Sequence, residues 1–302
     1  MPSASSSQYA LLTGCVIALL LAVVTGCTAG YRQRADALAE AVGASASWVS
    51  SGKHRHRVYE KAGTGPVLRV YLGGDGRAFL QRQVVAPDPT PAEHLTLKLM
   101  LADPGPAVFV ARPCYYGTAT EPGCEPRLWT SERYSDEVVA SLAQVIHRLA
   151  AEHAGMPLQL VGYSGGGVIA VRLAQHLPEA VAVITLAAPL DTGAWTAHHG
   201  YTPLAPGQNP AGMASWPGTI RQLHLSGASD DNVPPELQAG YRRRMQSLDP
   251  SAVFRTLPDY DHHCCWLRNW PEILARHGAE GDTRNGLTRS RQAPRIAPVA
   301  AL

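Results

Sequence analysis

The sequence predicts an α/β protein with a mostly parallel central sheet and helices on both faces. The chain has 302 residues, of which 45% are hydrophobic and 17% charged, enough for one large core. From residue 67 onward, apolar strands and amphipathic helices alternate, which is typical of a parallel sheet covered on both faces. A glycine-rich turn around a serine joins one of these strands to the next helix. The net charge is only +2 and aromatic residues are few, so we expect no nucleic-acid partner.

The N-terminus is expected to be a targeting segment outside the fold. Residues 11–24 form an almost uninterrupted apolar run, short for a membrane span and typical of a signal peptide. The run ends in a motif that resembles the bacterial lipobox, Val24-Thr25-Gly26-Cys27. The resemblance implies a signal peptide over residues 1–26 and a lipid on Cys27. A plain secretory signal or membrane anchor is the alternative, and Cys15 ends a similar motif with too little apolar sequence before it.

The residue after the acylated cysteine bears on location. It is Thr28 instead of Asp. By resemblance to Gram-negative lipoproteins, this implies an anchor in the outer membrane facing the periplasm. We therefore expect a cell-envelope protein whose membrane contact is its N-terminal lipid.

Export changes the interpretation of the four cysteines that follow, because disulfides persist outside the cytoplasm. Cys114 and Cys124 bracket a loop rich in Gly, Pro and Thr, so a disulfide across this loop is the first expectation. Cys264 and Cys265 are adjacent. They either bond to each other through a strained turn or pair with the other two, and the sequence leaves the connectivity open.

The chain divides into segments that differ in composition. Residues 27–60 are expected to form a stalk or first helix, with helical spacing over 31–43 and a basic run at 53–57 that we interpret as a solvated surface segment. Residues 61–277 form the main domain, and the polar, basic tail over 278–302 is expected to be disordered. The strands predicted in the main domain are 67–72, 107–111, 158–162, 181–187, 222–226 and 253–257. A helix should begin after Ser135, which is followed by two acidic residues and a regular apolar face.

The most informative motif follows the third predicted strand. The chain reads Gly162-Tyr163-Ser164-Gly165-Gly166 and then continues as an apolar helix. A serine on a sharp turn between strand and helix needs glycine two residues before and two residues after it, because the backbone leaves no room for side chains. The following helix directs its N-terminal amides at the place where an oxyanion would form. Ser164 is therefore the candidate nucleophile.

This arrangement resembles the α/β-hydrolase superfamily over roughly residues 65–277. In that family an acid and then a histidine follow the serine along the chain. The run from Gly227 to Pro234 is similar to the family's Gly-x-x-Asp-x-x-Val-Pro turn, which selects Asp230 as the acid. Asp231 is the neighbouring alternative, and Asp191 after the preceding strand is a weaker one.

The base should follow the last strand, where the chain carries two adjacent histidines. We favour His262, because the Asp-His pair that it forms with the residue before it resembles many members of the family; His263 is the alternative. The adjacent Cys264 and Cys265 do not make this run a metal site in our interpretation, since zinc ligands are normally spaced along the chain. We expect neither a metal nor another cofactor.

The oxyanion hole needs a second backbone amide besides that of Gly165. The glycine-rich loop after the first strand of the main domain occupies the expected place. We assign the amide of Asp75, with Gly74 as the neighbouring choice. Gly73 stands where the family commonly has histidine.

The resemblance implies a serine hydrolase that cleaves a carboxylic ester or related acyl bond through Ser164, His262 and Asp230. An acyltransferase with the same triad and a non-catalytic envelope-binding lipoprotein are the alternatives. The substrate would be a small-molecule or lipid acyl compound, with inserts over 112–130 and 190–217 shaping its pocket through their aromatic residues. For Arg112, beside a strand end, we expect a structural ion pair.

Overall fold

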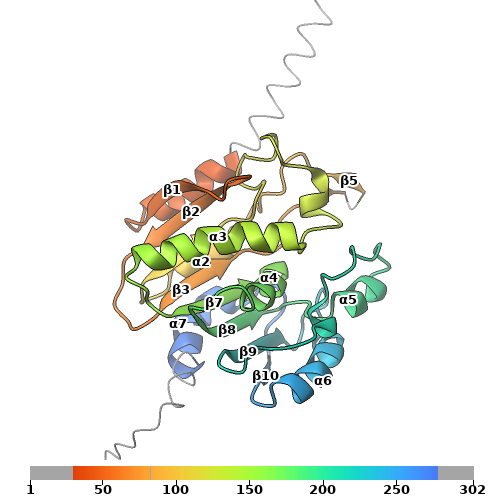
Figure 1. Ribbon diagram of the computed structural model, residues 1–302. Helices are drawn as coiled ribbons and strands as arrows, with labels where there is room; N and C mark the ends of the chain where they lie inside the picture. Colours follow the sequence, from red (N-terminus) through yellow and green to blue (C-terminus); the bar gives the residue numbers. More distant parts are fainter. Residues whose placement is uncertain (1–29, 82, 278–302) are drawn as a thin grey trace, which may run out of the picture.

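The computed structural model describes residues 30–81 and 83–277. An eight-stranded sheet forms its centre, in the order β1-β2-β6-β3-β7-β8-β9-β10 (Figure 1). From β6 to β10 every neighbouring pair is parallel, whereas β1, β2 and β6 pair antiparallel. The strands are β1 (Ser45–Ser50), β2 (Arg55–Lys61), β3 (Leu68–Leu72), β6 (Ala107–Val110), β7 (Leu158–Tyr163), β8 (Ala180–Leu186), β9 (Arg221–Gly227) and β10 (Val253–Leu257). The mostly parallel sheet predicted from the sequence is confirmed.

Helices cover both faces of this sheet. On one face α2 (Leu95–Leu101) packs against α7 (Trp266–His277), and Trp270 of α7 donates a 2.9 Å hydrogen bond to the Tyr71 hydroxyl on β3. On the other face α3 (Asp136–Glu152) packs against α4 (Gly165–Leu173). Further helices are α5 (Thr192–His198), α6 (Ala239–Leu248) and a helical stretch over residues 30–40. Three short 3-10 segments span Pro126–Trp129, Pro210–Gly212 and Pro235–Gln238. None of the helices within the described ranges is long and apolar enough to cross a membrane.

The helix α3 begins where the sequence predicts. Ser135 is its N-cap and accepts a hydrogen bond from the Val138 amide, while Asp136 and Glu137 stand in the first turn. The positive end of the helix dipole stabilises the negative charges of these two side chains. The buried face of α3 carries Val139, Leu142, Ile146 and Leu149 among others, which matches the predicted apolar stripe.

The segment before residue 61 is part of the central sheet. Residues 30–40 are helical, and β1 and β2 then extend the sheet beyond β6, so the boundary expected at residue 60 falls inside β2. The interpretation of residues 53–57 as a solvated segment is wrong for three of its residues, since His54, His56 and Arg57 are at most 9% exposed. Lys53 and Arg55 do face solvent.

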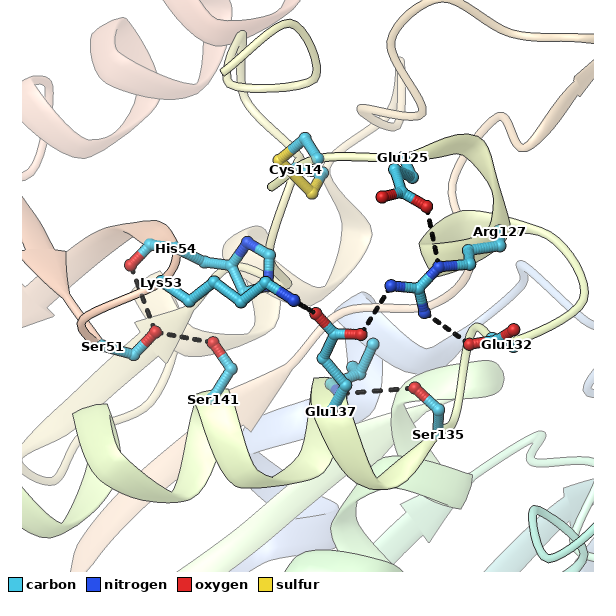
Figure 2. Close-up of polar contacts among 12 residues, drawn as sticks. Ser51, Lys53, His54, Cys114, Glu125, Arg127, Glu132, Ser135, Glu137 and Ser141 are labelled. Carbon is cyan, nitrogen blue, oxygen red and sulfur yellow. Dashed lines mark hydrogen bonds and ion pairs between the residues drawn. A yellow bond between two sulfur atoms is a disulfide. The ribbon is translucent and has the colours of Figure 1, made fainter. Parts of the chain in front are cut away.

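Specific partners compensate for burial of these polar side chains. His56 bonds to the Ala111 carbonyl oxygen (2.8 Å) and to the Ser141 hydroxyl (2.8 Å), and burial lowers the pKa of His56 to about 4. Arg57 forms an ion pair with Asp36 at 2.7 Å. Figure 2 shows how Glu137 of α3 lies between Lys53 and Arg127 and so links the β1–β2 turn to the loop before the helix.

The four cysteines of the described chain form two disulfides. Cys114 is bonded to Cys124, as expected, and Cys264 is bonded to Cys265. His54 lies close to the first disulfide, and its ring and the two sulfur atoms come within 4.8 Å of one another. Both sulfurs are already committed to each other in this disulfide. Cys27 and residues 278–302, for which the sequence predicts a lipid and a disordered tail, lie outside the described residues.

Candidate active site

Ser164 occupies a strained turn between β7 and α4. Its φ of 52° and ψ of −127° are rare for a residue with a side chain, and such strain is concentrated at functional sites. A Cβ on Gly162 would lie 2.3 Å from the Gly166 carbonyl oxygen, and one on Gly166 would lie 2.0 Å from the Leu72 carbonyl oxygen. The two glycines therefore allow the backbone to close the turn and present the serine hydroxyl at the carboxyl end of the sheet.

A continuous hydrogen-bonded series runs from this hydroxyl to a buried carboxylate. The Ser164 Oγ is 3.1 Å from His262 Nε2, and His262 Nδ1 is 2.9 Å from Asp230 Oδ2. The other oxygen of Asp230 accepts hydrogen bonds from the backbone amides of Asn232 (3.0 Å) and Val233 (2.7 Å). Asp230 is thereby fixed so that it favours a proton on Nδ1, which leaves Nε2 able to accept the serine proton.

The alternative residues lie elsewhere. Asp231 is exposed beside Asp230, and Asp191 is the N-cap of α5, where it accepts a hydrogen bond from the Ala194 amide at 3.1 Å. His263 is exposed, and its Nδ1 lies 3.2 Å from the Tyr163 hydroxyl. None of these three side chains takes part in the series that contains Ser164.

Two neighbours of His262 were missed from the sequence. The Asn232 side-chain nitrogen is 3.0 Å from His262 Nε2, so it can donate to the same atom as Ser164. The Tyr163 hydroxyl donates to the His262 carbonyl oxygen at 2.9 Å and supports the loop that carries the histidine. Asn232 lies two residues after Asp230, but no general motif distinguishes it from an ordinary turn residue.

The loop after β3 approaches Ser164 from the opposite side. A Cβ on Gly74 would lie 3.2 Å from the Cβ of Ser164, so only glycine keeps the loop this close without a shift. Within the described residues, the amides of Gly74 and Asp75 donate no hydrogen bond. The amide of Gly165 stands in the first turn of α4, where no intrahelical partner exists. The turn thus offers free backbone donors on both sides of the serine.

The Asp75 side chain is held by a cluster that the sequence did not reveal. Its carboxylate forms ion pairs with Arg112 (2.6 Å) and Arg133 (2.9 Å) and accepts a hydrogen bond from the Tyr134 hydroxyl (2.8 Å). Burial by itself raises the Asp75 pKa, but the two arginines outweigh it and bring this pKa down to about 2. The structural ion pair expected for Arg112 is confirmed.

A cavity of about 920 Å³ opens onto Ser164 and His262. The predicted insert over 190–217 contributes Trp195, Thr196 and residues 200–204 to its wall, and the insert over 112–130 contributes only Tyr116 and Thr130. Much of the rest comes from residues 73–79, which include the loop predicted to supply the oxyanion hole, and from residues 91–97, which carry no sequence signal. Phe79 and Val85 also line it; they belong to the small antiparallel hairpin of β4 (Phe79–Leu80) and β5 (Val84–Val85).

The chain resembles known proteins in its structure and not detectably in its sequence. No family model matches the chain, and no curated protein sequence matches it. The solved structures that resemble it include an esterase from Pyrococcus furiosus, at 11% identity and a TM-score of 0.55 over 81% of this chain and 94% of that one. An α-β serine hydrolase homologue from Coxiella burnetii matches at 16% identity and a TM-score of 0.53, over 77% and 96% of the two chains.

A third resemblance points the same way. An α/β serine hydrolase without a lid from Xanthomonas campestris matches at 17% identity and a TM-score of 0.50, covering 78% of this chain and 94% of that one. The chain has the α/β-hydrolase fold. In this fold the ends of the parallel strands β3, β7, β9 and β10 lead into the segments that carry Asp75, Ser164, Asp230 and His262. This is where open parallel sheets generally bind their ligands.

Proposed function

We propose that the chain is a serine hydrolase that cleaves a carboxylic ester, or a related acyl bond, through an acyl-enzyme. The observation that carries this proposal is the series Ser164, His262 and Asp230, with contacts of 3.1 and 2.9 Å, at a strained turn that opens onto a cavity. A serine, a histidine and a carboxylate in hydrogen-bond contact in this order form the geometry of nucleophilic catalysis.

The proposed reaction has two steps. His262 Nε2 accepts the proton of Ser164 as the hydroxyl oxygen attacks the substrate carbonyl, and Asp230 stabilises the imidazolium that forms. The amides of Gly165 and Asp75, or Gly74 in place of Asp75, would donate to the tetrahedral oxyanion. The protonated His262 then donates its proton to the departing alcohol. In the second step water gives a proton to the same histidine and attacks the acyl carbonyl. The bond between Ser164 Oγ and the acyl group then breaks, His262 returns the proton to Ser164 Oγ, and the acid is released.

The test is hydrolysis of chromogenic 4-nitrophenyl esters of graded acyl length by the purified chain without its first 27 residues. We expect turnover in the wild type and a loss of at least about a thousandfold in kcat for Ser164→Ala and for His262→Ala. Ser229→Ala, an exposed serine in the turn before Asp230, is the matched control and should keep full activity. A folded wild type that hydrolyses no ester would contradict the proposal. Added alcohols distinguish an acyltransferase, because acyl transfer would give new esters in place of the free acid.

We further propose that the protein is anchored in the outer membrane by a lipid on Cys27. The lipobox-like motif and the apolar run before it support this proposal. In bacteria grown with an alkynyl fatty acid, the wild type should incorporate the label and Cys27→Ser should not. Cys15→Ser is the control and should retain labelling. Unlabelled wild type, or labelling that depends on Cys15, would contradict the assignment.

A further inference from the structure

Two arginines and a single carboxylate meet beside the Ser164 turn. Arg112 and Arg133 both form ion pairs with Asp75, and in the described chain neither arginine has another carboxylate within ion-pair distance. The Asp75 carboxylate lies against Gly165, because a Cβ on that glycine would be 2.0 Å from Asp75 Oδ1. Arg133 therefore contacts Asp75, and Asp75 in turn lies against Gly165, the residue after Ser164.

This cluster carries one positive charge more than it can balance. Both guanidinium groups stay protonated at every physiological pH, and the Asp75 pKa of about 2 keeps its carboxylate ionised. Another buried acid, Asp88, accepts hydrogen bonds from the Thr90 amide and hydroxyl and forms no ion pair with either arginine. An unbalanced charge in a buried wall costs free energy unless an opposite charge approaches it.

Arg133 is the member of the cluster that can meet a ligand. Arg112 is fully buried, with a side chain only 1% exposed, whereas Arg133 lines the same cavity as Ser164 and His262. Arg133 uses Nε to donate to the Thr130 carbonyl oxygen (2.6 Å) and Nη1 to donate to Asp75. Its remaining nitrogen, Nη2, makes no hydrogen bond with the described residues and keeps some exposure to solvent. The guanidinium is thus held rigidly with one donor edge free.

We propose that Arg133 binds an anionic group of the substrate, so that the enzyme prefers acyl compounds that carry a carboxylate close to the scissile ester. This inference rests on the proposed function for the reaction at Ser164. A carboxylate is the simplest group that accepts hydrogen bonds from a fixed guanidinium edge, and a phosphate shares the same chemistry. The Phe79 and Val85 side chains line the same cavity and offer an apolar surface to another part of the same molecule.

The kinetic test compares esters that differ only in charge. The mono-4-nitrophenyl esters of succinate, glutarate and adipate are paired with the neutral butyrate, valerate and hexanoate esters, and a phosphate-bearing ester forms a third arm. We expect at least one carboxylate ester to exceed its neutral partner in kcat/KM by about tenfold, mainly through KM. A phosphate arm that exceeds the carboxylate arm would identify the phosphate as the preferred source of the charge.

Variants of Arg133 test whether this residue causes the preference for anionic esters. Arg133→Gln should reduce the anionic-to-neutral ratio of kcat/KM about tenfold, and Arg133→Lys should restore part of it. Arg127→Gln is the matched control, because Arg127 lies in the same loop and is paired with glutamates outside the cavity, so the ratio should not change. Equal hydrolysis of charged and neutral esters by the wild type, or an equal loss on both in Arg133→Gln, would overturn the proposal and leave the cluster a support for the Asp75 loop.

A binding measurement separates this inference from the proposed function. Calorimetric titration of the Ser164→Ala protein with glutarate should give binding that weakens at least tenfold in Ser164→Ala/Arg133→Gln, while the neutral diamide of glutaric acid binds neither protein. Glutarate binding by a wild type that hydrolyses no ester would reject the hydrolase and retain the anion site. Ester hydrolysis without charge-dependent binding would do the reverse.

Discussion

Among the single residues of the candidate site, two glycines have no room for a side chain, because a Cβ atom at either position would force the backbone to shift. Gly162 and Gly166 are packed against main-chain oxygens at distances that exclude a methyl group, and Ser164 lies between them with a positive φ of 52°. Asp230 is equally constrained, since both of its oxygens have partners. The close packing around the turn and the hydrogen bonds of Asp230 hold the hydroxyl and the imidazole in one geometry despite the strain at Ser164.

Gly166→Ala tests the constraint on the turn. Its methyl group would lie 2.0 Å from the Leu72 carbonyl oxygen, so either α4 or β3 must shift. We expect a loss of about 1–3 kcal/mol in the free energy of unfolding, measured by urea denaturation, together with a large loss of the proposed hydrolase activity. Gly218→Ala is the control, because a Cβ there meets nothing within 4 Å. A fully stable and active Gly166→Ala protein would show that the turn is looser than described.

Asp75 gives a prediction about acid stability. Its pKa in the folded protein, about 2, lies below the unfolded value near 3.8, so the folded state favours the ionised carboxylate. The resulting stability is present above about pH 4 and is lost as the pH falls toward 2. A shift of this size corresponds to about 2 kcal/mol. The free energy of unfolding of Asp75→Asn should therefore fall less steeply between pH 4 and pH 2 than that of the wild type, and parallel curves would contradict the assignment.

At the scale of elements, the rim of the cavity is formed partly by the β4–β5 hairpin. Phe79 and Val85 line the cavity although each is about 40% exposed, whereas Val84 on the same hairpin is 57% exposed and does not line it. Apolar side chains that stay exposed at a cavity mouth are suited to contact an apolar part of the ligand.

The hairpin predicts a dependence on acyl length. Phe79→Ser and Val85→Ser should raise KM for octanoate esters several-fold while changing KM for acetate esters little, since only a long chain reaches the hairpin. Val84→Ser removes a similar apolar area beside the cavity and should leave both values unchanged. Steady-state kinetics with the two esters decides the matter, and an equal effect of Val84→Ser and Val85→Ser would exclude a role for the hairpin in substrate contact.

The elements also show where sequence analysis succeeds and where it fails. The six parallel strands were predicted within about one residue, because each holds several apolar residues and is bounded by glycine or proline in the flanking turns. The strands β1 and β2 were missed. Their buried members include His56 and Arg57, which sequence patterns place at the surface and which are buried here only because Ser141, Ala111 and Asp36 supply partners.

The candidate site divides in the same way. Ser164, Asp230 and His262 could be proposed from the sequence because a strand-to-helix serine turn and the order of the following loops are local signals. The contacts of Asp75 with Arg112, Arg133 and Tyr134 join residues 37 to 59 positions apart. No periodicity or spacing encodes such a cluster, so it becomes visible only when the loop after β3 is seen against the loop before α3.

At the scale of the whole molecule, one sheet and one core hold the segments of the site together. Helical residues 30–40 contribute Ala35 and Ala39 to the core, and β2 contributes Val58 and Tyr59. The first described segment therefore extends the sheet beyond β6. The strand β6 lies next to β3, and the loop after β3 lies at the candidate active site.

Truncation tests this integration. A chain that begins at residue 28 should fold cooperatively, as followed by circular dichroism during thermal unfolding. A chain that begins at residue 62 should aggregate or unfold at a much lower temperature, because it lacks β1 and β2 and exposes the β6 edge and apolar core. A stable and active protein from residue 62 would instead show that the first segment is a dispensable addition to the catalytic domain.

We propose that Ser164 is a nucleophile activated by His262 and Asp230. Labelling with a fluorophosphonate, followed by mass spectrometry of the labelled peptide, tests it most directly because the probe reports nucleophilic attack and needs no knowledge of the substrate. We predict one adduct per chain, located on Ser164, which is absent from Ser164→Ala and strongly reduced in His262→Ala and Asp230→Asn. A folded wild type that remains unlabelled, or an adduct on another serine, would contradict the account.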